Sequence, residues 1–589
     1  MKKRMALMLV LTMLVSPAAC GGTAFCEESA AVSPVYSQGR DEGNTAREIT
    51  RKEYPVHIME MELDEPLPLY FLKDGPDLPY VELGDWTGIL NFICTDGGTD
   101  PGYLLRLETE GSSAAFIRET GYSMIMDFDR DTFEFWDYNG FMKVPAMATL
   151  LDFAARRCVN DEGEPSLMKK TGEVSYDRYG DGKIVSLGDY GIDLICQDGL
   201  YLAPLQTMSD FTLAPGASAM NCFFNGRCVL FSSLGTEPFA ALYYDAPTGR
   251  RSEALTRYGY SELCLMLDSF YGLKDIHGIG SFRQFIREAG LEEAFLSPDA
   301  ETADRALCTL IRHYIDDLHS SFDAFSCLAG PLKVSADRGP SYASLAEHRR
   351  LHGEARERQY PEGVPQYEEI GNTAYITFDH FEVLAESYEA YYGHENIQDI
   401  PFEDTIAMII RAHEQITRQD SPIENVVIDL SCNVGGSVDS AAFLLAWCLG
   451  KSSISLRDSF TGAVSTTDYW ADVNLDRVFD ERDSIADRNL FCLISPVSFS
   501  CGNLVPNVFR QSGRVTLLGR TSGGGSCVVM PASTAWGTAF SISSPRRMSF
   551  LKNGSLYDID RGADPDYAIS RPEKYYDRQA LTAYIGSLY

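Results

Sequence analysis

Basic residues are scarce in this chain of 589 residues. It has 50 lysines and arginines against 84 aspartates and glutamates, which gives a formal net charge of -34 at pH 7. A surface of this charge repels phosphate backbones and anionic lipid headgroups. We therefore expect no nucleic-acid partner.

The fifteen cysteines lack the spacing that is typical of zinc sites or of small disulfide scaffolds. Two of them, Cys222 and Cys228, are close enough in sequence to form a local disulfide. Several others lie in apolar runs, as buried free thiols do: Cys94, Cys196, Cys448 and Cys492. Nothing in this pattern specifies a metal.

The N-terminal apolar run, residues 5–15, is too short to span a bilayer comfortably. It follows the basic stretch MKKR and precedes small residues, which predicts an export signal over residues 1–26. Cys20, preceded by two alanines and followed by two glycines, resembles a bacterial lipoprotein cleavage site and would then carry the lipid. Pro17 stands where that pattern usually has leucine, so simple secretion after cleavage near Ala24 is the alternative. The predicted location is the outer face of the cell membrane or the exterior, with membrane contact only through the lipid anchor.

The length favours about three to four domains, and the sequence pattern changes character at several points. A polar linker is predicted first, then short strand-like segments such as GYLLRLET, TFEFWDY, CVLFSS and ALYYDA with two short helices near 147–157 and 205–211. Apolar residues at three- and four-residue spacing follow, which predicts helices. The predicted units are a linker at 27–58, a β-rich accessory domain at 59–255, a helical unit at 256–330, a second linker at 331–370 and a core at 371–589.

Strands and helices alternate within that core. NTAYITF, NVVIDLS, LFCLIS and VTLLG are short apolar strand patterns, and helical patterns such as EDTIAMIIRAHEQIT and SVDSAAFLLAWCLG separate them. This alternation predicts an α/β core with a largely buried sheet.

The stretch FCLISPVSFSCGN, residues 491–503, begins as a buried strand and ends in a cluster of hydroxyls. A serine at a strand-to-helix turn can present its oxygen to a cleft, with the helix amides behind it. Ser498 and Ser500 are also good capping residues, so an ordinary helix cap is the competing interpretation.

Two further elements would complete a site for acyl transfer. Gly435 and Gly436 follow the strand NVVIDLS and let the backbone approach a ligand closely. With the amide of Cys501, they could supply an oxyanion hole, although a tight turn needs glycine in any case. His319 stands where the helical unit ends, a position at which most histidines are caps or surface residues.

These elements together resemble the tail-specific, or carboxyl-terminal-processing, serine peptidases and their tricorn-like relatives. VVIDLSCNVGG is similar to that family's strand and glycine turn, and ISPVSFSCGNLVPNVFRQSGRVTLLGRTSGG is similar to its nucleophile segment. NTAYITFDHF and LYDIDRGADPDYAI resemble the strand before them and the closing signature. The resemblance covers residues 260–589 and implies the α/β crotonase-like spiral fold.

The resemblance also implies roles for individual residues. Counted back from Gly513, the nucleophile falls on Ser500. The lysine base of the processing branch would lie near Gly524, where there is none, whereas Asp317-Leu318-His319 matches the histidine element of the tricorn-like branch. Asp558 or Asp560 would orient that histidine. No inserted module with a carboxylate-binding loop is recognisable between His319 and the core.

The predicted function is that of an exported serine endopeptidase. His319 takes the Ser500 proton, the amides of Gly436 and Cys501 hold the oxyanion, and water releases the acyl-enzyme. The substrate is a protein or peptide, and no metal or organic cofactor is needed. A binding protein on a degenerate peptidase scaffold and a serine hydrolase acting on cell-wall peptides or esters are the alternatives. Acyl-CoA chemistry is disfavoured because an exported protein does not meet that cofactor.

Overall fold

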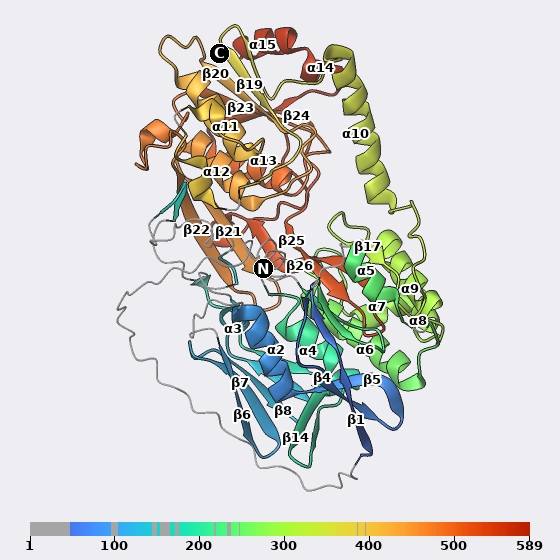
Figure 1. Ribbon diagram of the computed structural model, residues 1–589. Helices are drawn as coiled ribbons and strands as arrows, with labels where there is room; N and C mark the ends of the chain where they lie inside the picture. The colour runs from blue at the N-terminus through green and yellow to red at the C-terminus, as the bar shows by residue number, and fades with distance from the viewer. Residues whose placement is uncertain are drawn as a thin grey trace.

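The computed structural model describes residues 47–59, 61–95, 104–143, 150–152, 165–170, 176–216, 220–232, 237–246, 248–385, 387–394 and 396–588. Figure 1 shows the C-terminal core at one end of the molecule and the accessory sheets at the other. The predicted export signal, Cys20, most of the first linker and most of the helix expected near 147–157 lie outside these residues.

A six-stranded sheet forms the centre of the C-terminal core, in the order β18-β19-β20-β23-β24-β29. All its strands pair in parallel except β18, which is antiparallel to β19. Their bounds are β18 Tyr367–Ile370, β19 Thr373–Thr377, β20 Asn425–Asp429, β23 Asn489–Ile494, β24 Val515–Gly519 and β29 Tyr567–Ala568. The α/β alternation read from the sequence is confirmed.

Helices cover both faces of this sheet because its central strands are apolar on both sides. In β23, Cys492 packs with α11 (Thr405–Thr417), α12 (Val438–Leu449) and α13 (Cys501–Ser512). Its neighbours Phe491 and Leu493 face the opposite cluster, which contains residues of α10 (Pro340–Gln359), α14 (Glu573–Tyr576) and α15 (Arg578–Gly586). Such double coverage is what near-continuous apolar strands require.

Helix α10 occupies half of the segment 331–370 that the sequence predicted as a linker. It spans twenty residues, yet only His352 and Ala355 are buried in it. The remaining positions are largely polar, so no apolar stripe marks the helix in the sequence. Ala355 packs against the sheet cluster, and the His352 ring accepts or donates a hydrogen bond of 2.8 Å with the Tyr576 hydroxyl.

A second, seven-stranded sheet connects the C-terminal core to the rest of the chain. β21 (Ser452–Asp458), β22 (Val464–Ala471), β25 (Cys527–Ser533) and β26 (Ala539–Ser549) come from the core. β10 (Met168–Lys170) and β11 (Tyr176–Arg178) of the accessory region pair with β22, and β17 (Ser321–Ala324) pairs with β26. Strands from all three predicted units therefore share this sheet.

Three further sheets make up the accessory region, which confirms its β-rich character. Their orders are β1-β4-β5-β14-β13, β12-β9-β8-β7-β6 and β15-β16-β2-β3. The strands are β1 Ile49–Tyr54, β2 Val56–Ile58, β3 Met61–Glu62, β4 Leu67–Leu72, β5 Gly75–Glu82, β6 Leu105–Glu110, β7 Ser113–Arg118, β8 Ser123–Asp127, β9 Thr132–Phe135, β12 Lys183–Ser186, β13 Ile195–Gln197, β14 Leu200–Pro204, β15 Asn221–Phe224 and β16 Val229–Ser232.

Two accessory helices differ from the sequence prediction. ALYYDA was expected as a strand, but α5 runs from Glu237 to Tyr244, because Phe239 and Tyr243 lie four residues apart and both pack on Phe223. α2, Leu83–Thr95, was not anticipated. The helix expected near 205–211 is confirmed as α4, Leu205–Thr212.

Cys222 and Cys228 are free thiols rather than a disulfide. Cys222 lies on β15, and Cys228 directly precedes β16, the strand that pairs with β15. The residue opposite Cys222 in this strand pair is Phe231 and not Cys228. The Cys228 thiol instead donates to Asn225 Oδ1 at 3.5 Å.

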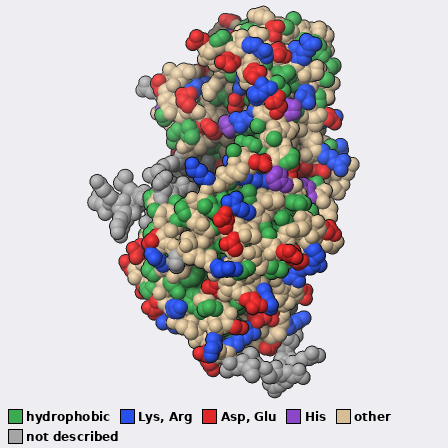
Figure 2. Space-filling model, turned by 90° about the vertical axis from the view of Figure 1, so that its right-hand side faces the viewer, with side chains coloured by type: hydrophobic (Ala, Val, Ile, Leu, Met, Phe, Trp, Pro, Cys, Tyr) green, Lys and Arg blue, Asp and Glu red, His purple; other side chains and the backbone are tan. Residues whose placement is uncertain are grey.

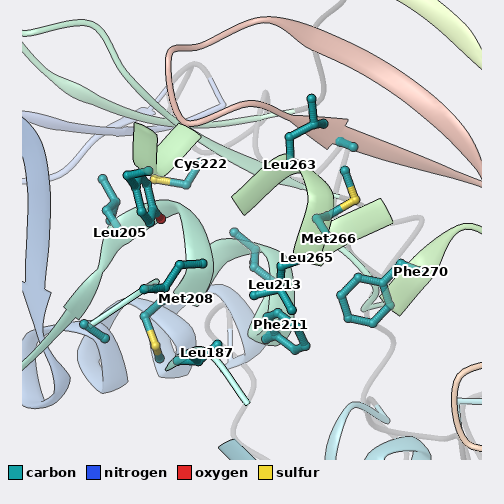
Figure 3. Close-up of a cluster of buried hydrophobic side chains, with 14 of the residues drawn as sticks. Leu187, Leu205, Met208, Phe211, Leu213, Cys222, Leu263, Leu265, Met266 and Phe270 are labelled. Carbon is teal, nitrogen blue, oxygen red and sulfur yellow. The ribbon is translucent and has the colours of Figure 1, made fainter. Parts of the chain in front are cut away.

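The helical unit packs directly on the accessory domain. It comprises α6 (Glu253–Phe270), α7 (Phe282–Glu288), α8 (Glu292–Phe295), α9 (Ala300–Thr309) and the π-helical turn η3 (Leu310–Ile315). Figure 3 shows Met208 and Phe211 of α4 in one apolar cluster with Leu263, Met266 and Phe270 of α6. The two predicted units thus share a core.

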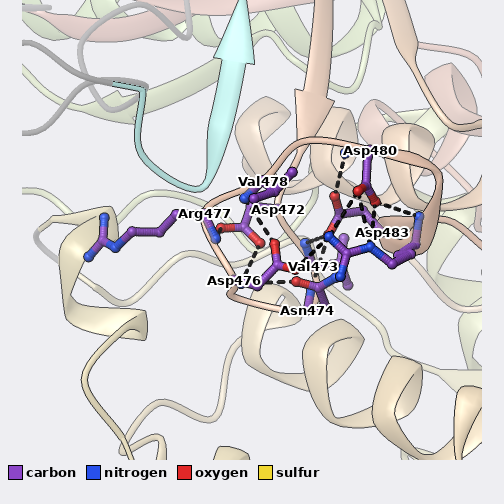
Figure 4. A network of polar contacts seen from close by, with 9 residues as sticks. Asp472, Val473, Asn474, Asp476, Arg477, Val478, Asp480 and Asp483 are labelled. Atoms are coloured by element: carbon purple, nitrogen blue, oxygen red, sulfur yellow. Dashed lines mark hydrogen bonds and ion pairs between the residues drawn. The ribbon is translucent and has the colours of Figure 1, made fainter.

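Carboxylates that accept hydrogen bonds from backbone amides stabilise the loop that follows β22 (Figure 4). Asp472 accepts hydrogen bonds from the amides of Asp476 and Arg477, and Asp483 accepts from those of Val473 and Asn474. Over the described part of the chain, no group of three or more His, Cys, Asp or Glu residues is arranged to hold a metal ion.

The surface mixes both signs of charge. Figure 2 shows acidic side chains interspersed with lysines and arginines on the face it presents. Among the described helices, none has the length and apolar character that a bilayer crossing requires.

The buried ion pair between Asp429 and Arg578 yields a prediction about stability. Arg578 of α15 lies 2.6 Å from Asp429 at the end of β20, and both side chains are almost fully buried. Arg578→Ala should lower the free energy of unfolding by about 3–5 kcal/mol, because it leaves the carboxylate buried without its partner. Arg358→Ala, which removes an exposed pair with Glu573, should cost about 0–1 kcal/mol. Urea unfolding measures both, and equal losses would contradict this account.

Candidate active site

Ser500 occupies a strained turn between β23 and α13. Its φ of 57° and ψ of -122° are unusual for a residue with a side chain, and such strain costs of order 1–3 kcal/mol. The Ser500 hydroxyl makes no capping hydrogen bond to the helix, although the residue stands at the cap position. The capping interpretation of Ser500 is therefore not supported.

Ser498 has a different role. Its side chain is fully buried, its hydroxyl donates to the Leu430 carbonyl at 2.7 Å, and its oxygen accepts from the Ser495 amide at 2.9 Å. Because these bonds satisfy the hydroxyl, Ser498 holds the turns after β20 and β23 together. Ser500 is half-buried and is the more accessible of the two serines.

The glycine turn after β20 lies directly against Ser500. A Cβ atom at Gly435 would stand 2.6 Å from the Ser500 Cβ and 3.0 Å from its hydroxyl oxygen, so only glycine fits there. The Asn433 side chain shapes this turn, since its Oδ1 accepts the Gly435 amide at 2.9 Å and its Nδ2 donates to the Phe378 carbonyl at 3.2 Å.

Of the three predicted oxyanion residues, two keep an uncommitted amide. The Gly435 amide donates to Asn433, so it is not available to an oxyanion. The amides of Gly436 and Cys501 have no recorded acceptor within the described residues. The Cys501 thiol donates to the Gly436 carbonyl at 3.2 Å and ties these two backbone segments together.

His319 reaches the same region from the helical unit. The chain leaves η3 through Asp316 in the left-handed conformation, with φ 45°. The His319 ring then lies over the ring of Phe499, the residue before Ser500, with centroids 4.6 Å apart. No hydrogen bond between His319 and Ser500 is recorded here, and in unliganded enzymes catalytic hydrogen bonds are often long.

Asp317 fixes the turn that carries His319. Its carboxylate accepts from the amides of His319 and Ser320, both at 2.9 Å, and from the hydroxyls of Tyr271 and Ser543, also at 2.9 Å. The Asp317 carboxylate thus positions the turn that carries His319. The sequence indicated Asp317 only as part of the Asp-x-His match.

Burial lowers the pKa of His319 below its ordinary value of 6.5. The negative charges of Asp317 and Asp560 oppose this shift but do not outweigh it. The aspartates alone would raise this pKa, and desolvation of the ring by its surroundings outweighs them.

The two candidate orienting acids are placed differently. Asp560 is largely buried, accepts from the Ser526 amide and hydroxyl at 2.8 Å, and pairs with Arg547 at 2.8 Å. Asp558 is more exposed and lies 3.3 Å from Arg547. Of these two acids, only Asp560 raises the pKa of His319 through its charge, against the larger effect of burial.

Gly524 supports the nucleophile rather than supplying a base. Its carbonyl accepts the Ser500 amide at 2.9 Å. Its φ is 81°, and a Cβ there would lie 2.3 Å from the Asp560 carbonyl oxygen. A lysine at this position would therefore displace the backbone that holds Ser500.

Three supporting residues escaped the sequence analysis: Asn433, Arg547 and Phe499. Asn433 lies inside the glycine motif and could have been singled out there. Arg547, at the end of β26, has no sequence signal, because its partner Asp560 comes from a separate segment. The tilted contact between the Phe499 and His319 rings joins residues 180 positions apart and is visible only in the fold.

Comparison with known protein families finds a match for the part of the chain that contains Ser500. Residues 372–569 match the sequence model of peptidase family S41. No curated protein matches the chain.

Three solved structures show low similarity. A photosystem II D1 C-terminal processing protease is 14% identical over 34% of this chain and 43% of its own length, with a TM-score of 0.25. A putative peptidase from Parabacteroides merdae is 16% identical over 56% of this chain and 96% of its own, with a TM-score of 0.38. The tricorn protease is 10% identical over 91% of this chain and 53% of its own, with a TM-score of 0.28. The chain thus spans less than half of the D1 protease, and these scores do not define the fold.

The packing around Gly524 generates a prediction. Gly524→Ala should lower kcat/KM by about 100-fold, because the added Cβ pushes the carbonyl that holds the Ser500 amide. Gly554 has a similar φ of 76° but open space around its Cβ position. Gly554→Ala should therefore cost only the conformational penalty, about 1 kcal/mol, and keep full activity. Wild-type rates in Gly524→Ala would contradict the proposed role.

Proposed function

We propose that this chain, in which residues 372–569 match peptidase family S41, is a serine peptidase that acts as an exported endopeptidase through Ser500 and His319. The observation that carries the assignment is the uncapped hydroxyl of Ser500 on a strained turn. A Cβ atom at Gly435 would lie 3.0 Å from this hydroxyl oxygen, Gly436 is the next residue of that turn, and Cys501 follows Ser500 in the chain. No other serine singled out in the sequence combines these features.

In the proposed reaction, Ser500 Oγ attacks the carbonyl carbon of the scissile bond and its proton passes to a ring nitrogen of His319. The negative charge that develops on the carbonyl oxygen is held by the amides of Gly436 and Cys501, which are already oriented before the substrate binds. The protonated His319 gives its proton to the leaving amine, and water then hydrolyses the acyl-enzyme by the reverse sequence.

Two carboxylates stabilise the charged His319 in this scheme. Asp317 accepts a hydrogen bond from the His319 amide and favours the protonated ring through its charge. Asp560, which is paired with Arg547, favours the protonated ring through its charge. Asp560 is therefore preferred to Asp558 as the acidic partner.

Export is the second part of the proposal and rests on the N-terminal sequence alone. Incorporation of labelled fatty acid that disappears in Cys20→Ala would support lipidation, and an unlabelled mature protein beginning near Phe25 would favour simple secretion.

The nucleophile assignment predicts distinct outcomes for two serines. Ser500→Ala should abolish fluorophosphonate labelling and reduce peptide hydrolysis by several orders of magnitude, because no other group can form the acyl-enzyme. Ser498→Ala removes two buried hydrogen bonds. It should lower stability by about 1–3 kcal/mol and keep the labelling. Labelling that persists in Ser500→Ala would contradict the assignment, and an unlabelled wild type would favour the binding-protein alternative.

The electrostatics of His319 predict the pH dependence. The base must be neutral to accept a proton, and the pKa of His319 is lowered from 6.5. As the pH decreases, kcat/KM should therefore stay at its plateau past pH 6.5 and fall only at a lower pH. Asp560→Asn should move this acid limb to still lower pH because it removes a charge that favours the protonated ring. Asp558→Asn is the matched control and should leave the limb in place. A limb above pH 6.5, or one unaffected by Asp560→Asn, would contradict His319 as the base.

A further inference from the structure

A cleft of about 600 Å³ lies where the accessory domain, the helical unit and the C-terminal core meet. One wall is strand β12, and the other is formed by the turn 271–275 together with residues at and just beyond the end of β21. The Asp181 amide donates to the Thr461 carbonyl at 2.9 Å, and Asn139 Nδ2 donates to Asp458 at 2.9 Å. These bonds fix the two walls relative to one another.

The β12 wall is the edge of a sheet. β12 ends the five-stranded sheet and, among the described strands, pairs only with β9. All four of its residues line the cleft, and since neighbouring side chains point to opposite faces, the cleft borders the strand's edge rather than one face. Ile184 on this edge is 66% exposed. An open strand edge with an exposed apolar side chain is a template for pairing with another extended chain.

Two cations in this cleft have no carboxylate partner. Lys183 lies over the Phe460 ring at 5.5 Å, and neither its ammonium group nor the Arg457 guanidinium has an ion pair recorded within the described residues. The other lysine of the cleft, Lys274, pairs with Asp268 at 2.6 Å.

The charged residues that line the cleft give it a different charge balance from that of the strongly acidic chain as a whole. Asp268 is paired with Lys274, and Asp275 faces Arg547 at 3.8 Å. Because Arg547 pairs more closely with Asp560, Asp189 and Asp275 are the carboxylates of the lining to set against Lys183 and Arg457. In a chain with a net charge of -34, this is a place where a negative group can be received.

The same cleft adjoins the catalytic machinery. Tyr271 lines it, and the Tyr271 hydroxyl donates at 2.9 Å to Asp317, whose carboxylate shapes the His319 turn. Arg547 connects Asp275 of the cleft to Asp560. A chain bound in the cleft therefore lies against residues that touch the active site.

We propose that the cleft binds an extended segment of the peptide substrate as an added strand on β12, with a carboxylate of that segment received by Lys183 and Arg457. The inference rests on the proposed peptidase function. The carboxylate can belong to a chain terminus or to an aspartate or glutamate side chain.

Binding to Ser500→Ala protein tests the proposal without turnover. The probes are fluorescein-labelled pools of 12-residue peptides with randomised sequence, read by fluorescence anisotropy. One pool has a free C-terminus and no Asp or Glu, a second has an amidated C-terminus and contains Asp and Glu, and a third has neither source of carboxylate. We expect the third pool to bind about tenfold more weakly than at least one of the others, which then identifies the source.

The preference for carboxylate should disappear when Lys183→Gln and Arg457→Gln are added together. It should persist with Lys333→Gln, which removes an exposed lysine outside the cleft. N-methylation of alternate peptide amides should weaken binding about tenfold, since it removes ladder hydrogen bonds. Equal binding of all three pools, a preference that survives the double substitution, or indifference to N-methylation would overturn the proposal.

The two proposals fail separately. If the wild type is not labelled by fluorophosphonate but carboxylate-dependent binding is present, the peptidase mechanism fails and the cleft assignment stands. If the wild type hydrolyses peptides and binding ignores Lys183 and Arg457, only the cleft assignment fails.

Discussion

The close approach of Gly435 to Ser500 is the constraint on which the site depends. The two residues follow adjacent parallel strands, β20 and β23, whose carboxyl ends lie at the same edge of the sheet. No side chain fits at Gly435, and Ser500 must adopt a strained backbone conformation to remain there. Asn433, Ser498 and the Gly524 carbonyl hold the two turns in place with hydrogen bonds, so the strain is supported from several sides.

Assembly of the site requires the helical unit in addition to the matched segment. His319 lies two residues before β17, and β17 pairs with β26 of the core. The Ser543 hydroxyl of β26 donates to Asp317, which fixes the His319 turn from the core side. Tyr271, from the end of α6, donates to the same carboxylate. The helical unit therefore carries His319, and β26 sets the position of the His319 turn relative to Ser500.

The sequence predicts those parts of the fold that local patterns encode. The apolar strands of the central sheet, the β-rich accessory region and the amphipathic helices of the helical unit follow from periodicity, and the motifs locate Ser500, the glycine turn and His319. Helix α10 escaped because only His352 and Ala355 are buried in it. α5 escaped because an aromatic run fits a helix and a strand equally well until its packing on Phe223 is known.

The finer features of the site are long-range and could not be read from the sequence. The Gly435 amide donates a hydrogen bond to the Asn433 side chain, and a sequence motif does not reveal this bond. The preference for Asp560 over Asp558 depends on burial and on Arg547, which comes from another strand. The lowered pKa of His319 depends on what surrounds the ring, and that includes Phe499.

The most direct test of the account is a crystal structure of the protein after reaction with a fluorophosphonate. The account predicts a covalent bond from phosphorus to Ser500 Oγ. The phosphonyl oxygen should lie within hydrogen-bond distance, roughly 2.7–3.1 Å, of the amide nitrogens of Gly436 and Cys501, with His319 beside the adduct. A bond to another residue, or a phosphonyl oxygen that points away from both amides, would contradict it.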